Sequence, residues 1–348
     1  MIKLPLCLGL GAASLDWLLV VVAVLPAAGL AFNVMLDPLR IYWRRGQGAP
    51  ASVLRRRKLE LMQRLQAQTP IRTLVVGGSR IYNLDLGAAG FPAPVFNFAV
   101  TNARVEDYLA AYRLVCAGQA SPPAVFVICC ATTVFHPSNP LPLEAQVSGS
   151  YSKALAQIGA ISRHWWTWLC LLIAVEQYRL SWQRMRRLLG LRAKRAHKFH
   201  MREDGWATWT ADASPGRFDQ QLRSYPFTGI RLTTFTEMGA QRSAWWEQVL
   251  AEANALGSRV VALVMPGEHP AMLERIVELG GGAILPMMTK HIRTGVERHG
   301  GLFLDWHAPA QIGLTPEDYR DALHLSDEAQ TRLAARLHSE YIRRWDED

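Results

Sequence analysis

Two short motifs, one near each end of the chain, carry residue types that could perform nucleophilic chemistry. In the first, an apolar run of strand length ends in two glycines followed by Ser79. In the second, Asp321 and His324 lie three residues apart, just before a helical pattern. A serine hydroxyl becomes a nucleophile when a histidine takes its proton and a carboxylate orients that histidine. About 240 residues separate the motifs, so only a fold that places its first strand beside its last loop would unite them.

Each motif taken alone is a weak signal. A glycine turn with a serine more often caps a helix or binds a phosphate, and an Asp-x-x-His before a helix could be a surface turn. Gly78 permits a tight turn, and Ser326 is placed to cap the final helix. The two motifs together, after the first strand and before the last helix, indicate a site more specifically than either does alone.

The hydrophobic pattern predicts strands that alternate with helices. Fully apolar runs of strand length are typical of a parallel sheet covered on both faces, and ligands bind such sheets at the carboxyl ends of the strands. The expected strands are 72–77, 94–98, 124–130, 259–265 and 302–305, and the expected helices are 104–116, 243–255, 288–298 and 327–345.

A long apolar segment near the N-terminus predicts a membrane anchor. Between residues 4 and 36 the only charged residue is Asp16, and residues 17–36 have about the length that spans a bilayer core. Pro26 is tolerable in a membrane helix. The competing interpretation is a cleaved signal peptide, which is disfavoured because the apolar region is long and residues 38–45 are a poor cleavage context.

The distribution of charge and the spacing of the cysteines exclude some classes of function. The net charge is +9, with arginines gathered at 40–58 and 184–198. Juxtamembrane surface charge or docking to anionic lipid explains these clusters; no nucleic-acid recognition motif accompanies them, so no nucleic acid is expected. The five cysteines show no CxxC and no metal-ligand spacing, so we predict no metal and no cofactor. Cys129 and Cys130 should point to opposite faces of one strand.

The predicted organisation has three parts. Residues 1–37 form the anchor, 38–70 form a basic amphipathic linker, and 71–348 form the α/β domain. Within that domain, residues of about 137–235 do not follow the strand–helix alternation and are interpreted as an insertion. Its apolar run at 164–175 is either a core helix or an interfacial helix. The interfacial alternative is open because tryptophans come first in the run and arginines follow it.

These motifs resemble the SGNH (GDSL-like) hydrolase superfamily. The resemblance rests on Gly78-Ser79-Arg80, on Asn97–Asn102 after the second strand, and on Asp321–Leu325, and it covers about 30–130 and 235–345. The layout is similar to membrane-anchored members that work beside membrane-bound O-acyltransferases and acylate bacterial cell-wall polymers or exopolysaccharides. The resemblance implies a three-layer, flavodoxin-like α/β fold preceded by one transmembrane helix.

The resemblance also implies roles for individual residues. Ser79 would be the nucleophile, His324 the general base and Asp321 its orienting carboxylate, and Gly78 would be one of the residues that bind the oxyanion or the substrate. Asn102 stands where the superfamily has a glycine that lends a backbone N–H to the oxyanion hole.

The superfamily's third-block asparagine is missing, because the third strand is followed by Ala131-Thr132-Thr133. Arg80 or Thr132 is the expected substitute donor. Three histidines that follow strand ends are interpreted as structural, with a place near the site as the alternative: His136, His269 and His307.

The expected function is that of a serine O-acyltransferase or acyl esterase acting on an extracytoplasmic polysaccharide or cell-wall polymer. The expected partners are the lipid bilayer and a multi-span membrane-bound O-acyltransferase. The protein is expected in the inner (cytoplasmic) membrane, with its domain on the periplasmic side. Two alternatives stay open. The missing asparagine favours a non-catalytic assembly partner of the acyltransferase, and the arginines after the anchor favour a cytoplasmic domain.

Overall fold

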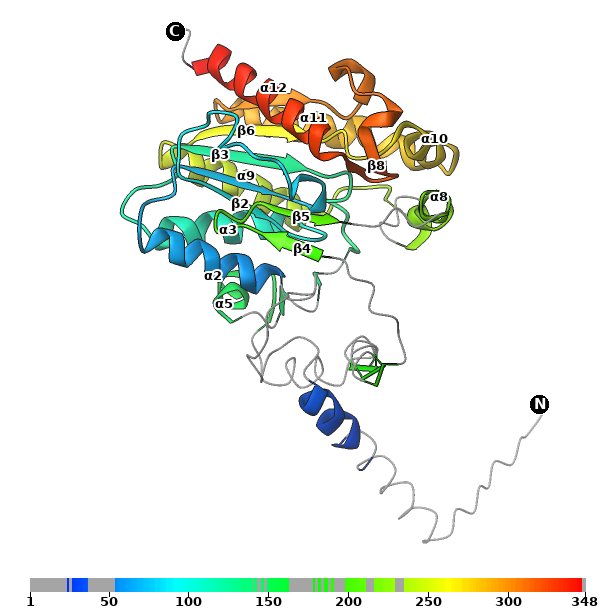
Figure 1. Ribbon diagram of the computed structural model, residues 1–348. Helices are drawn as coiled ribbons and strands as arrows, with labels where there is room; N and C mark the ends of the chain where they lie inside the picture. Colours follow the sequence, from blue (N-terminus) through cyan, green and yellow to red (C-terminus); the bar gives the residue numbers. More distant parts are fainter. Residues whose placement is uncertain are drawn as a thin grey trace, which may run out of the picture. The chain divides into compact units, whose positions relative to one another are not determined.

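The computed structural model forms two compact units. One comprises Met1–Gln47 with Ser162–Arg195, and the other comprises Gly48–Ile161 with Ala196–Asp348; Figure 1 shows the ribbon. The residues that the structure describes are 24, 27–36, 54–139, 141–142, 145–146, 149–162, 178, 181–182, 185–186, 189–190, 198–210, 216–228 and 235–345.

The larger unit is built on a parallel sheet of five strands with the order β2-β1-β3-β6-β7. Numbered along the chain, that order is 2-1-3-4-5, as in flavodoxin-like doubly wound sheets, whose topological switch point lies between the first and third strands. The prediction of a parallel α/β fold is confirmed. The strands are β1 (Thr73–Gly77), β2 (Val95–Ala99), β3 (Val125–Cys130), β6 (Arg259–Val264) and β7 (Leu302–Asp305).

Helices cover both faces of the sheet, which gives three layers. Alternate residues of β3 enter different clusters: Ile128 and Cys130 pack with one set of helices, whereas Val127 and Cys129 pack with the other. The predicted opposite orientation of the two cysteines is therefore confirmed. One face carries α2 (Leu54–Gln66), α3 (Val105–Ala117), α9 (Ala240–Ala255) and α11 (Ile284–Arg298); the other carries α12 (Asp327–Trp345), the red helix of Figure 1.

Each strand predicted from the sequence is present within two residues of its expected bounds, and the predicted helices are present with up to four further residues at one end. Several short elements were not predicted, because elements of a few residues give too little sequence for an apolar period to stand out, even where one is present as in α10. These are η2 (Ser79–Ile81), α5 (Ser150–Gln157), β4 (Lys198–Met201), β5 (Ala207–Thr210), α8 (Arg217–Thr228), α10 (Pro270–Glu278), η4 (Gly281–Ala283), η5 (Pro309–Ile312), η6 (Pro316–Asp318), β8 (Tyr319–Asp321) and β9 (His324–Leu325).

Helix α2, which the sequence presents as a basic linker, packs within the larger unit and buries two of its cations. Arg55 and Lys58 have no exposed surface. Arg55 forms an ion pair with Asp107 of α3 at 2.9 Å. Lys58 Nζ donates to the carbonyl oxygen of Asn97 at 2.8 Å and lies over the ring of Tyr82. Burial holds the pKa of Lys58 well below its ordinary value.

Among the described residues, no helix is long and apolar enough to cross a membrane. Residues 27–36 are helical. Residues 17–23, 25 and 26 of the predicted span 17–36, and the whole apolar run at 164–175, lie outside the described residues, so both the membrane span and the role of that run stay predictions.

The hairpin β4–β5 docks on the edge of β2 and on the turn that follows β1. The amide of Asn97 donates to the carbonyl of Asp204 at 2.8 Å, and the amide of Ala207 donates to the carbonyl of Tyr82 at 2.7 Å. The green hairpin lies beside β2 in Figure 1. At its turn, Gly205 has a φ of +78°, and a Cβ there would approach the Asn97 carbonyl oxygen to 2.4 Å. The close docking of the hairpin therefore requires glycine.

We predict that Gly205→Ala destabilises the protein more than Gly257→Ala does. Gly257 has a similar φ of +80° but nothing within 4 Å of its would-be Cβ. Its substitution should therefore cost about 1 kcal/mol of left-handed strain, whereas Gly205→Ala adds a backbone clash worth roughly 1–3 kcal/mol more. Thermal unfolding of the full-length variants measures the difference. Equal losses would contradict the docking described here.

Candidate active site

Ser79 lies at the carboxyl end of β1, beside the topological switch point. Its side chain is half-buried. The preceding Gly77 is needed for space, because a Cβ would lie 2.9 Å from the carbonyl oxygen of Cys129 and 2.7 Å from Ile81 Cδ1. A Cβ at Gly78 would meet nothing within 4 Å, so this glycine leaves open space next to the serine. The turn is held from α12 by Gln330, whose amide donates to the Arg80 carbonyl at 2.5 Å.

Asp321 and His324 face each other across the tight hairpin β8–β9. His324 Nδ1 lies 2.9 Å from Asp321 Oδ1, and His324 Nε2 lies 3.2 Å from Ser79 Oγ. The fold thus brings together the two motifs that were distant in sequence. Since the Nδ1–H donates to the carboxylate, Nε2 is left to accept the serine proton. The amide of Leu323 donates to Asp321 Oδ1 at 2.9 Å and fixes the carboxylate.

The electrostatics of this pair suit a neutral base beside an ionised carboxylate. Burial lowers the pKa of His324 below its ordinary 6.5, and the neighbouring Asp321 offsets this only in part. Burial opposes ionisation of Asp321, but the hydrogen bond and charge of His324, the Leu323 amide and Arg217 hold its pKa well below the ordinary range. At neutral pH His324 is therefore able to accept a proton, and Asp321 is charged.

Two further contacts to the hairpin come from α8, within the region interpreted as an insertion. Arg217 Nη2 lies 3.5 Å from Asp321 Oδ2. Gln221 Oε1 accepts a hydrogen bond from the amide of Ala322 at 3.0 Å. Neither residue could be predicted from the sequence, because both lie on a polar helix far from the other motifs. The insertion thus contributes directly to the surroundings of the candidate site.

The loop after β2 meets the Ser79 turn at the same edge of the sheet. The amide of Val100 donates to the carbonyl of Gly77 at 2.9 Å. Asn102, two residues later, has a φ of +56°, as expected for an asparagine that replaces a glycine. Buried Arg104 holds it there, since Arg104 Nη1 donates to Asn102 O at 2.5 Å and to Asn102 Oδ1 at 2.6 Å.

A network of buried charged side chains also holds the loop after β2. Arg55 Nη2 donates to the carbonyl of Thr101 at 3.1 Å, and both Arg55 and the amide of Arg104 bind the carboxylate of Asp107. Tyr82 Oη lies 2.6 Å from Thr101 Oγ1 and links the loop to the Ser79 turn. Arg104 also donates to the side-chain oxygen of Asn139. The sequence did not predict roles for Arg55, Arg104, Asp107 and Asn139.

Arg80 and Thr132, the expected substitutes for a missing oxyanion donor, both donate to Glu268. Arg80 Nη2 lies 2.5 Å from Glu268 Oε1, and Thr132 Oγ1 lies 3.0 Å from the same oxygen. All three side chains are buried. Gly267 allows this approach, because a Cβ there would lie 2.2 Å from Arg80 Cδ. These contacts give Arg80 and Thr132 a structural partner, and their predicted contact with substrate stays a prediction.

The three histidines that follow strand ends have structural partners. His136 is buried against Phe235, and its Nδ1 accepts from the amide of Ser138. His269 caps α10 by accepting from the amide of Ala271. His307 Nδ1 lies 2.5 Å from Asp305 Oδ1.

Comparisons with protein-family models, with curated proteins and with solved structures found no match. The class of the molecule is therefore defined by its own geometry. It is a three-layer α/β protein in which a serine, a histidine and an aspartate are linked by hydrogen bonds at the carboxyl edge of a parallel sheet.

We predict that Ser79 reacts with a fluorophosphonate at a rate that falls on acidification, with an apparent pKa below 6.5. The reactive form needs neutral His324, so the rate should be constant from pH 7 upward and fall tenfold per unit below the pKa. Labelling reactions that are quenched after set times, at pH values between 4.5 and 8, measure this rate.

Asp321→Asn serves as the comparison for the pH profile. It should slow labelling by about 10⁴-fold, because the imidazole loses its orienting carboxylate. A midpoint above 6.5 in the wild-type profile would contradict the assignment of His324 as a buried neutral base.

Proposed function

We propose that this protein is a membrane-anchored, SGNH-like serine O-acyltransferase or acyl esterase that acts on an extracytoplasmic polysaccharide or cell-wall polymer. The observation that carries the proposal is the continuous hydrogen-bonded set of Ser79 Oγ, His324 Nε2 and Asp321 Oδ1, with contacts of 3.2 Å and 2.9 Å. A half-buried serine beside a buried neutral histidine is the arrangement that acyl transfer through an acyl-enzyme requires.

In the proposed reaction, Ser79 Oγ attacks the acyl carbonyl carbon while its proton passes to His324 Nε2. Collapse of the tetrahedral intermediate breaks the bond to the donor group, which leaves with the proton from His324. A sugar hydroxyl or water then attacks the carbonyl carbon of the acyl-serine and gives its proton to His324. The bond between the acyl group and Ser79 Oγ breaks, Ser79 Oγ takes the proton back from His324, and the ester or acid product leaves. Asp321 stays ionised throughout and stabilises the imidazolium.

The backbone amides of Ser79 and Asn102 are the donors that we propose for the developing oxyanion. The Asn102 amide belongs to a loop whose carbonyl groups are held by Arg55 and Arg104, so the loop is fixed before substrate binds. Such preorganised donors act where charge develops in the transition state. This network supports a working enzyme over a vestigial site, since a docking surface alone would not need it.

Labelling of the full-length protein in membranes with a fluorophosphonate tests the nucleophile. Wild-type protein should label, and Ser79→Ala should not, because the activated hydroxyl is lost. Ser339→Ala, which removes an exposed hydroxyl on α12, is the matched control and should label normally. Wild-type labelling no stronger than that of Ser79→Ala would overturn the proposed acyl-enzyme.

The same variants separate catalysis from assembly in cells. Ser79→Ala and His324→Ala should abolish polymer acylation while the protein still reaches the membrane. Retention of acylation by both variants would favour the alternative, in which the chain only assembles with a membrane-bound O-acyltransferase.

A phosphatase fused to the C-terminus tests the proposed location. The fusion should be active, because such phosphatases fold only outside the cytoplasm and the proposed substrate lies there. A fusion at residue 37, after the predicted anchor, is the control for insertion of that anchor. An inactive fusion at Asp348 in a stably expressed protein would place the domain in the cytoplasm, as the arginines after the anchor suggest.

A further inference from the structure

Two segments that are far apart in the sequence form the smaller unit. Contacts join Met1–Gln47 to Ser162–Arg195, although more than a hundred residues lie between them. The described parts include the helical residues 27–36 and the helical positions 178, 181–182 and 185–186. The insertion therefore returns to the N-terminal helix and packs against it.

A buried polar contact joins the two segments. Ser181 Oγ donates to Asn33 Oδ1 at 2.6 Å, and neither residue has exposed surface. One turn earlier, Gly29 lies so close to Tyr178 that a Cβ would fall 1.9 Å from the phenol oxygen. Gly29 and Asn33 are four residues apart and share one helix face. Tyr178 and Ser181 both contact this face.

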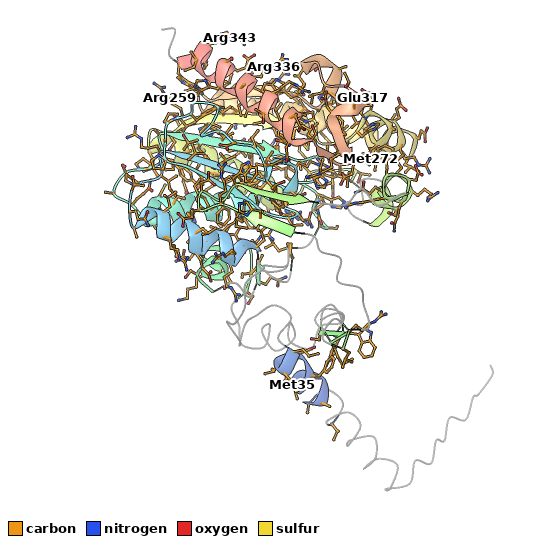
Figure 2. The ribbon with its side chains drawn as sticks, in the orientation of Figure 1. Met35, Arg259, Met272, Glu317, Arg336 and Arg343 are labelled. Atoms are coloured by element: carbon orange, nitrogen blue, oxygen red, sulfur yellow. The ribbon has the colours of Figure 1, made fainter. Side chains whose placement is uncertain are left out.

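Several apolar side chains are exposed in the described part of this unit, although Ser162 and Arg186 are exposed there as well. Large hydrophobic side chains are exposed at Val24 (55 %), Met35 (71 %), Trp182 (54 %) and Leu189 (61 %); Figure 2 labels Met35 on the N-terminal helix. These are four of the seven large hydrophobic residues that are exposed in the described parts of the chain, although the unit supplies few of the described residues. A small or polar contact inside and apolar side chains outside is the arrangement of helices that pack in lipid.

Both sequences become basic just beyond the contact. Arg40 and Arg44 follow Asn33, and Arg184 and Arg186 follow Ser181. Tryptophan and arginine next to a membrane segment suit the headgroup region of a bilayer, especially one with anionic lipid.

We propose that the part of the insertion that holds Tyr178, Ser181 and Trp182 lies at the membrane beside the N-terminal helix, with Trp182 against lipid at the headgroup level and the Ser181–Asn33 hydrogen bond shielded between the segments. The membrane element then has two packed segments and is not a single anchor. This inference rests on the anchoring part of the proposed function and extends it to the insertion, which also carries the α8 contacts to Asp321 and Ala322.

Disulfide trapping tests the pairing in membranes that contain the full-length protein. Asn33→Cys combined with Ser181→Cys should oxidise to an intramolecular disulfide. Asn33→Cys combined with Trp182→Cys is the matched control and should not, because Trp182 is exposed on the unit surface. No cross-link in the first variant, or a cross-link only between two chains, would overturn the pairing.

Lipid contact is tested with an environment-sensitive fluorophore on single cysteines, with Cys7, Cys116 and Cys170 replaced by alanine. The full chain is reconstituted in phosphatidylcholine vesicles with about a third phosphatidylglycerol and spin-labelled acyl chains. Fluorophores at Trp182→Cys and Met35→Cys should be quenched severalfold more than one at Ser339→Cys on α12.

The outcomes separate this inference from the proposed function. Quenching at position 35 without quenching at position 182 would overturn the inference and leave the anchor standing. Quenching at neither position would overturn both lipid contact and the anchor, while fluorophosphonate labelling of Ser79 would still report on the catalytic proposal.

Discussion

The hydrogen bond between His324 and Asp321 is the interaction on which the candidate site depends. The imidazole is buried, and burial alone would make protonation costly. Asp321, three residues earlier in the same short hairpin, places a negative charge beside Nδ1, where it stabilises the imidazolium that forms when Nε2 takes a proton. The histidine is therefore neutral at rest and able to become charged when it takes the serine proton. Three elements hold the side chains of Ser79, His324 and Asp321 within hydrogen-bonding distance of one another: the end of β1 at Gly77, the turn at Ser79 and the start of α12.

The strands and the three linked residues could be predicted from the sequence because their signals are local. A parallel strand buried on both faces must be apolar throughout, as residues 125–130 are. The position of Ser79 follows from a topological rule, since the carboxyl ends of parallel strands share one edge of the sheet. Asp321 and His324 lie close in sequence, so a tight turn alone unites them, and only their meeting with Ser79 needed the fold.

The partners of these residues could not be predicted, because their signals are not local. Arg217 and Gln221 look like surface residues of a polar helix, and nothing near them in the sequence points to Asp321. Glu268 becomes a partner of Arg80 only through the docking of the loop after β6. The sequence predicts Arg55 and Lys58 as surface charges of a linker, because cations are seldom fully buried without a partner. The partner of Arg55, Asp107, lies 52 residues away in the sequence.

The buried charges around Asp107 are better explained by orientation than by stability. A buried ion pair seldom stabilises a fold more than apolar residues of similar volume would. An apolar replacement of Arg55 or Arg104 would, however, leave the carbonyls of Thr101 and Asn102 without the donors that orient them. Because a peptide plane is rigid, fixing the Thr101 carbonyl also fixes the Asn102 amide. The network therefore sets the direction of the N–H that the proposed reaction needs.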